Sequence, residues 1–97
     1  MPKKTLAKDG SKAKVTFEIK ADAQSVNLAG DFNGWDPAGT TLAKRKDGRF
    51  STTLTLPTGQ EYRYRYVIDG DTWENDPDAD AYVPNEHGSD DCVIDLR

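Results

Sequence analysis

Two tryptophans in turn sequences are the residues whose type and placement most need a chemical explanation. Trp35 lies in "AGDFNGWDP", residues 29–37, and Trp73 lies in "DGDTWENDP", residues 69–77. A turn needs Gly, Asn and Asp for its backbone geometry and gains nothing from a large apolar ring. A pair of exposed aromatic rings that forms one patch usually marks a binding site. The alternative, for either tryptophan alone, is that its ring closes the end of a hydrophobic core.

A flat aromatic ring in a polar loop suits a sugar as its ligand. A sugar ring has an apolar face of C–H groups, which an indole can cover, and an edge of hydroxyl groups, which polar side chains can bind. Arg65 points outward from a neighbouring strand and could donate hydrogen bonds to such hydroxyls, as could Asn75 and Asn85. Arg63 shares that face, but the pattern favours an ordinary solvated side chain there.

The elements that must position these side chains are strands. Residues 13–20, "AKVTFEIK", alternate strictly between apolar and polar, and residues 61–69, "EYRYRYVID", place three tyrosines on one face. Further short strands are expected around residues 25–30, 40–45, 49–56 and 90–96, with Gly, Pro, Asn and Asp between them. This spacing predicts an all-β fold, an antiparallel β-sandwich. The predicted core is Val15, Phe17, Ile19, Leu28, Phe32, Leu54, Tyr64, Tyr66 and Ile68.

The chain of 97 residues is long enough for one domain. We expect a flexible basic leader over residues 1–12 and a folded domain over residues 13–97. The net charge is −4, and the aromatic second half is acidic, which argues against nucleic acid as a partner. No apolar run reaches the roughly 20 residues of a membrane span.

The lysine-rich start has no apolar stretch of a secretory signal, and Cys92 is the single cysteine. Both features favour the cytoplasm. Cys92 has no partner for an internal disulfide and alternates with Ile94 and Leu96, so we expect a small buried apolar residue.

The two tryptophan motifs occur within a longer pattern. "VNLAGDFNGWDP", "YRYRYVIDGDTWENDPDADAYVPN" and the closing "VIDL" resemble the glycogen-binding, early-set domains of carbohydrate-binding module family 48. That family includes the glycogen-binding domain of the AMP-activated protein kinase β subunit and the N-terminal domains of branching enzymes and isoamylases. The resemblance covers residues 13–97. It implies an immunoglobulin-like sandwich that binds α-1,4-linked glucan and has no catalysis of its own. We expect no cofactor and no metal.

The resemblance also implies roles for particular residues. Trp35 and Trp73 match the two stacking tryptophans, and Arg65 matches a basic residue that reaches a sugar hydroxyl. In the loop "PNEHGSDDC", His87 stands where the kinase domain has a leucine that enters the sugar ring. Asp91 stands where that domain has an asparagine that binds hydroxyls. The implied partners are glycogen, starch and maltooligosaccharides, together with a glucan-metabolising enzyme or kinase.

Three alternatives accompany this hypothesis. Paired carboxylates can hydrolyse glycosides, but the acids here lie in polar loops without an apolar pocket to raise a pKa. Calcium could bind "DGDTWENDPDAD", although Trp73 and Glu74 stand where an EF-hand loop needs a ligand and a glycine. The third alternative is a protein-docking or regulatory module that has lost sugar binding, because an exposed tryptophan pair also resembles a protein-interaction hot spot.

Overall fold

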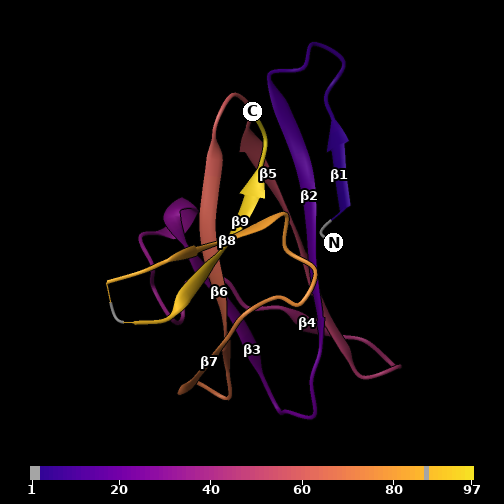
Figure 1. Cartoon of the computed structure of the whole chain (residues 1–97). Coiled ribbons are helices and arrows are strands. Elements are labelled where there is room, and N and C mark those ends of the chain that lie inside the picture. Colours follow the sequence, from indigo (N-terminus) through magenta and orange to yellow (C-terminus); the bar gives the residue numbers. More distant parts are fainter. Residues whose placement is uncertain (1–2, 87) are drawn as a thin grey trace.

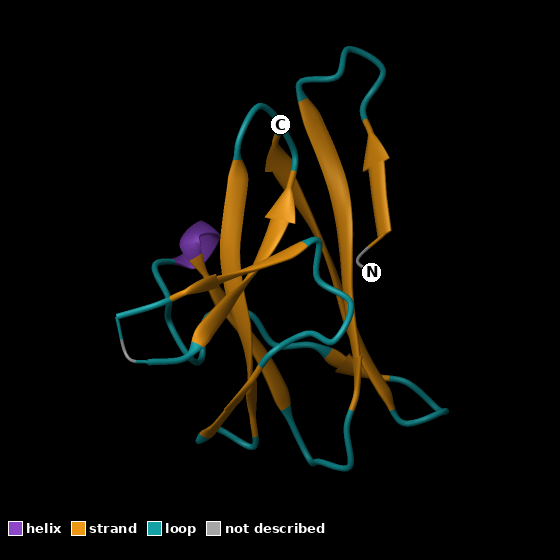
Figure 2. Ribbon diagram, in the orientation of Figure 1, coloured by secondary structure: helices purple, strands orange, loops and turns teal. Residues whose placement is uncertain are grey.

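The computed structural model describes residues 3–86 and 88–97, and two antiparallel sheets pack face to face in it (Figures 1 and 2). The first sheet has the order β1-β2-β5-β4 and consists of β1 (Lys3–Leu6), β2 (Lys12–Lys20), β5 (Arg49–Pro57) and β4 (Ala43–Lys44). The second has the order β3-β6-β9-β8 and consists of β3 (Val26–Gly30), β6 (Glu61–Ile68), β9 (Asp90–Asp95) and β8 (Ala81–Pro84). β7 (Thr72–Glu74) pairs with β6, and the short 3-10 helix η1 (Asp31–Asn33) follows β3. The predicted antiparallel β-sandwich is confirmed.

The core forms where the alternating faces of the two sheets meet. The inward residues of β2 are buried, and Tyr64 and Tyr66 of β6 face them with no exposed surface. Phe17 and Tyr64 pack edge to face, with 5.0 Å between ring centroids. This packing explains why the tyrosine strand tolerates three large rings on one face. The inward face of β2 consists of Ala13, Val15, Phe17 and Ile19.

The buried tyrosine hydroxyls need partners, and Asp76 supplies one acceptor for both. Its carboxylate accepts hydrogen bonds from Tyr64 at 3.0 Å and from Tyr66 at 3.4 Å. The backbone N–H of Asp76 donates to the sulfur of Cys92 at 3.0 Å. Burial, together with the Asp76 carboxylate, raises the pKa of Tyr64 and of Tyr66 well above the usual range. Asp76 thus ties the segment after β7 to the middle of the core.

Cys92 is buried, as the sequence predicts, and burial raises the pKa of its thiol to about 11. The fold therefore favours the neutral thiol. Below pH 9 the thiol is protonated in both the folded and the unfolded chain, and its contribution to stability is fully present. Between about pH 9 and 11 it ionises only when unfolded, so it lowers the free energy of unfolding by roughly 1.4 kcal/mol per pH unit.

We therefore expect urea denaturation of the wild type to show a loss of stability that begins near pH 9. The raised pKa values of Tyr64 and Tyr66 extend this loss above pH 10. Cys92→Ala should postpone the onset to the tyrosine range, whatever its effect at neutral pH. An unchanged onset in Cys92→Ala would contradict the assignment. Iodoacetamide should label Cys92 in urea and leave the native thiol unmodified.

Three residues of the predicted core are only partly buried, namely Phe32, Leu54 and Ile68, although all three pack against the core. Leu54 lies on the half of β5 that β4 does not reach, because β4 pairs only with Phe50 and Ser51. Ile68 is the last residue of β6, and Phe32 lies in η1 at an end of the sandwich. Edges and ends of a sandwich are covered on fewer sides than its centre.

The expected leader over residues 1–12 is wrong for Lys3–Leu6, which form β1 and pair with β2. The sequence lacked the signal because all four residues are exposed, so no apolar alternation marks the strand. Lys4 at the same time reaches the second sheet, where its Nζ forms an ion pair with Asp80 and donates to the carbonyl of Asp95.

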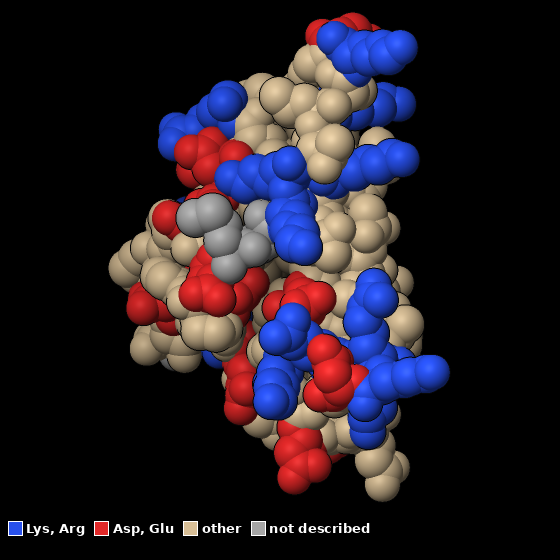
Figure 3. All heavy atoms as spheres, turned by 90° about the vertical axis from the view of Figure 1, so that its right-hand side faces the viewer, with Lys and Arg blue, Asp and Glu red and all other residues tan. Residues whose placement is uncertain are grey.

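The basic residues are concentrated on the first sheet. Figure 3 looks onto the side that carries β1 and β2, and lysine and arginine side chains gather there. Lys12, Lys14 and Lys20 alternate outward on β2, and Arg49 of β5 forms an ion pair with Glu18. No helix among the described residues is long and apolar enough to cross a membrane.

Candidate functional site

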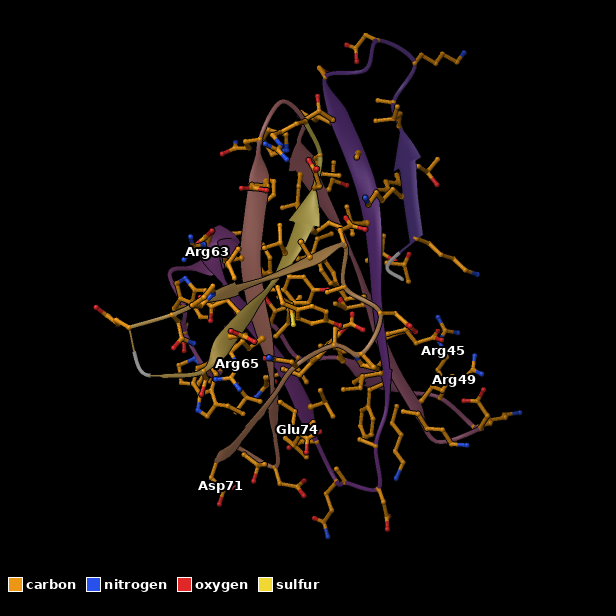
Figure 4. All side chains as sticks on the ribbon, viewed as in Figure 1. Arg45, Arg49, Arg63, Arg65, Asp71 and Glu74 are labelled. Carbon is orange, nitrogen blue, oxygen red and sulfur yellow. The ribbon has the colours of Figure 1, made fainter. Side chains whose placement is uncertain are left out.

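A groove of about 810 Å³ opens on the second sheet, and both tryptophans line it. Its walls come from four places: the loop after β3, the outward side of β6, β7, and the hairpin between β8 and β9. Figure 4 shows Arg63 and Arg65 along β6, whereas Arg45 and Arg49 lie at the opposite, right-hand side of the view. The lining residues are Asp31, Trp35, Arg63, Arg65, Trp73, Pro84, Asn85, Glu86 and Asp91.

Trp35 is held in the groove by an unusual backbone. Its φ is 60°, directly after Gly34 at 70°, so two consecutive residues are left-handed. This conformation costs a residue other than glycine about 1–3 kcal/mol and is concentrated at functional sites. The Trp35 N–H donates to the carbonyl of Gly30 at 2.9 Å, which closes the loop. The chain thus holds a bulky side chain in a backbone conformation that suits glycine.

Asp31 fixes the direction of the indole. One carboxylate oxygen accepts the Trp35 indole N–H at 2.9 Å, and the other accepts the backbone N–H of Arg63 at 2.8 Å. β3 ends opposite Tyr64, so the carboxylate supplies the acceptor for Arg63 that a longer strand would have supplied. One side chain therefore joins the tryptophan loop to β6.

Asn33 supports this loop from inside. Its amide oxygen accepts the N–H of Gly30 at 3.0 Å, and its amide nitrogen donates to the carbonyl of Leu28 at 2.7 Å. Gly30 must be glycine, because a Cβ there would lie 2.6 Å from the carbonyl oxygen of Arg63. The "GDFNG" residues that precede Trp35 thus fix the loop that positions its ring.

Trp73 reaches the groove from β7, where it lies opposite Val67 in the register with β6. Trp73 is 38% exposed, among the most exposed large apolar residues in the described part of the chain. Val67 shares this outward face of β6 but is completely buried, which alternation did not predict. The indole of Trp73 therefore offers a ring surface to solvent, as a stacking residue requires.

Arg65 lies between the two tryptophan-bearing segments and is held at two points. Its Nε donates to the amide oxygen of Asn75 at 2.7 Å, and one terminal nitrogen lies 3.4 Å from the carbonyl oxygen of Trp73. The guanidinium is thereby oriented beside the indole.

Asp91 lines the groove but is 7% exposed, and its carboxylate accepts a hydrogen bond from the amide of Asn85 at 3.0 Å. The Asp91 carboxylate is therefore hydrogen-bonded to Asn85, another residue that lines the groove. His87 lies outside the described residues. The structure brings together the other four predicted residues, Trp35, Arg65, Trp73 and Asp91, and their part in binding stays a prediction.

Residues 13–97 match the family model described as the glycogen recognition site of AMP-activated protein kinase. The chain belongs to this family. A glucoamylase of Neurospora crassa is 36% identical over 90 residues, which cover 77% of this chain and 14% of that enzyme. The chain thus spans only a small part of this relative.

Membership in the glycogen-recognition family confirms the resemblance seen in the sequence. The family consists of non-catalytic carbohydrate-binding modules, and the stretch of glucoamylase that matches is correspondingly short. Among the described residues, no group of three or more His, Cys, Asp or Glu side chains is arranged to hold a metal ion.

Sequence reasoning missed several groove residues of this glycogen-recognition domain. Asp31 precedes Trp35 by four residues within the same motif, so its spacing was a usable signal. The sequence pattern favours an ordinary solvated side chain for Arg63, but Arg63 lines the groove. The pairing of β8 with β9 brings Pro84 and Glu86 to the groove, and the local sequence does not indicate that pairing.

Proposed function

We propose that the groove binds α-1,4-linked glucan, with sugar rings stacked on Trp35 and Trp73. The observation that carries this proposal is the convergence of two tryptophans from separate loops on one groove, with Arg65 beside them. The family supports the class of ligand, because its description names glycogen recognition.

The groove has the two chemical features that a glucan needs. The indoles offer apolar surface to the C–H faces of the rings. Arg63 and Arg65 offer N–H donors to hydroxyl groups, and the side chain of Asn85 offers amide groups. In this proposal Asp31 and Asp91 orient their neighbours, since both carboxylates accept hydrogen bonds from groove residues.

The groove is open, so water competes for every hydrogen bond, and only a few sugar rings fit. Binding should therefore be weak, with Kd on the order of 10 μM to 1 mM for a maltooligosaccharide. Attachment to a longer glucan-metabolising enzyme or to a kinase would place that partner on a polymer with many equivalent sites. The share of the fungal glucoamylase that matches is consistent with such an attached module. A cytoplasmic location stays a prediction.

Sedimentation with insoluble polysaccharide tests the proposal directly. We expect the domain to sediment with insoluble amylose, to bind glycogen, and to stay in solution with cellulose. Maltoheptaose should shift the indole N–H signals of Trp35 and Trp73 in a heteronuclear NMR titration. If several millimolar maltoheptaose leaves both signals unmoved, glucan binding is wrong, and protein docking becomes the better account of the exposed rings.

A further inference from the structure

We propose that Asn75, itself hydrogen-bonded to β9, is the positioning residue that holds Arg65 in its binding orientation. This inference rests on the proposed function and deepens it. Asn75 does not line the groove, so it acts through Arg65 and makes no contact with the sugar.

The strand topology leaves a gap that Asn75 spans. On one edge of β6, pairing with β9 ends at Tyr64 opposite Cys92, and pairing with β7 begins at Tyr66 opposite Glu74. Arg65 lies between these two ladders, where the neighbouring strands diverge. The Asn75 amide oxygen accepts from Arg65 Nε at 2.7 Å, and its amide nitrogen donates to the carbonyl of Asp90 at 2.9 Å. The Asn75 side chain thereby connects Arg65 to β9 at the point where β7 and β9 diverge.

The position of Asn75 is itself fixed by the core. The next residue, Asp76, is 3% exposed, and its carboxylate and backbone N–H are bound by Tyr64, Tyr66 and Cys92. Asn75 therefore stands on an anchored backbone, although its own side chain is only half-buried.

This arrangement matters because a free arginine side chain loses much rotamer freedom when it binds a ligand. With Nε occupied by Asn75, the plane of the Arg65 guanidinium is set before a ligand arrives. Arg65 still lines the groove, and one of its terminal nitrogens lies beside the Trp73 carbonyl. An amide suits this place better than a carboxylate, since only the amide can accept from Arg65 and donate to Asp90 at once.

Calorimetric or NMR titration with maltoheptaose, in a double-mutant cycle, tests the proposal. Asn75→Ala should weaken binding by about threefold to tenfold in the wild-type background. In the Arg65→Ala background it should have almost no effect, because the group that it positions is gone. Asn75→Asp keeps the acceptor for Nε and should retain most of the affinity. Thr55→Ala, an exposed change on the other sheet, should match the wild type.

Equal effects of Asn75→Ala in both backgrounds would overturn the proposal, and so would unchanged affinity in Asn75→Ala. A second readout does not depend on sugar. The Arg65 Nε–H signal of the free domain should exchange slowly with water in the wild type and in Asn75→Asp, and rapidly in Asn75→Ala. If Asn75→Ala fails to fold, Asn75→Ser provides the comparison.

The two readouts separate failure of this proposal from failure of the proposed function. A wild-type domain that does not bind maltoheptaose but shows a slowly exchanging Arg65 Nε–H refutes glucan binding and leaves Asn75 as the holder of Arg65. If the wild-type domain binds maltoheptaose but its Arg65 Nε–H exchanges rapidly, the role of Asn75 is refuted and glucan binding stands.

Discussion

Trp73→Ala should weaken maltoheptaose binding by about tenfold or more, which corresponds to at least roughly 1.4 kcal/mol of binding free energy. The change removes a ring surface that no neighbouring side chain can replace. Because Trp73 is 38% exposed and lies in the short strand β7, the variant should stay folded, with a smaller loss of stability than Asp76→Ala. Titration calorimetry and urea denaturation of the same preparation provide the two measurements.

The matching change on the other side of the groove is Trp35→Gly, and here relief of backbone strain should reduce the loss of stability. Binding should fall as far as in Trp73→Ala. The backbone of residue 35 has a φ of 60°, a conformation that glycine adopts without strain, so relief of strain offsets the lost contacts of the ring. We expect Trp35→Gly to be at least as stable as Trp35→Ala.

Arg65→Ala is the informative comparison for both tryptophan changes. It should weaken binding less, because water replaces a hydrogen bond to a hydroxyl but cannot replace an apolar surface. If either tryptophan variant binds maltoheptaose as tightly as the wild type, the ring concerned is structural and the stacking proposal fails for it.

Asp76→Ala should produce the largest loss of stability, about 2–5 kcal/mol. The change leaves the hydroxyls of Tyr64 and Tyr66 buried without their shared acceptor. It also frees the segment that carries Asn75 and Trp73, so glucan binding should fall with stability. Chemical denaturation with fluorescence detection gives the free energy of unfolding.

The tyrosines provide the control for Asp76. In a Tyr64→Phe, Tyr66→Phe background the hydroxyls are already absent, and Asp76→Ala should cost much less than in the wild type. An equal cost in both backgrounds would show that the carboxylate stabilises the fold through other contacts, such as the Asp78 N–H that it accepts at 2.9 Å.

The strands that sequence predicts well are those with one buried face. Alternation in β2 and β6 follows directly from burial, and the structure has both strands in their expected orientation. β1 could not be predicted, because it is exposed along its whole length and is specified by long-range contacts, namely its pairing with β2 and the ion pair of Lys4 with Asp80. The complete burial of Val67 likewise depends on what lies over the outward face of β6, and alternation carries no information about that.

In the candidate site, too, some residues can be found from the local sequence and others only from long-range pairing. Trp35 and Trp73 stand out because their type conflicts with their local sequence. Asn75 stands out only as a possible partner for sugar hydroxyls, and an asparagine in a turn also has an ordinary explanation. Its role becomes visible only when β7 and β9 diverge around Arg65. Residues that orient other residues depend on long-range pairing and are the hardest to find from local patterns.

The left-handed backbone at Trp35 has a consequence for directed evolution of this domain. In a library screened for thermal resistance alone, variants that have lost Trp35 should carry glycine there more often than alanine, because glycine removes the backbone strain and ligand binding is not selected. A library screened for retention on glycogen should keep tryptophan and gain its stability elsewhere. The identity of this one residue would therefore report which of the two pressures a population of variants has experienced.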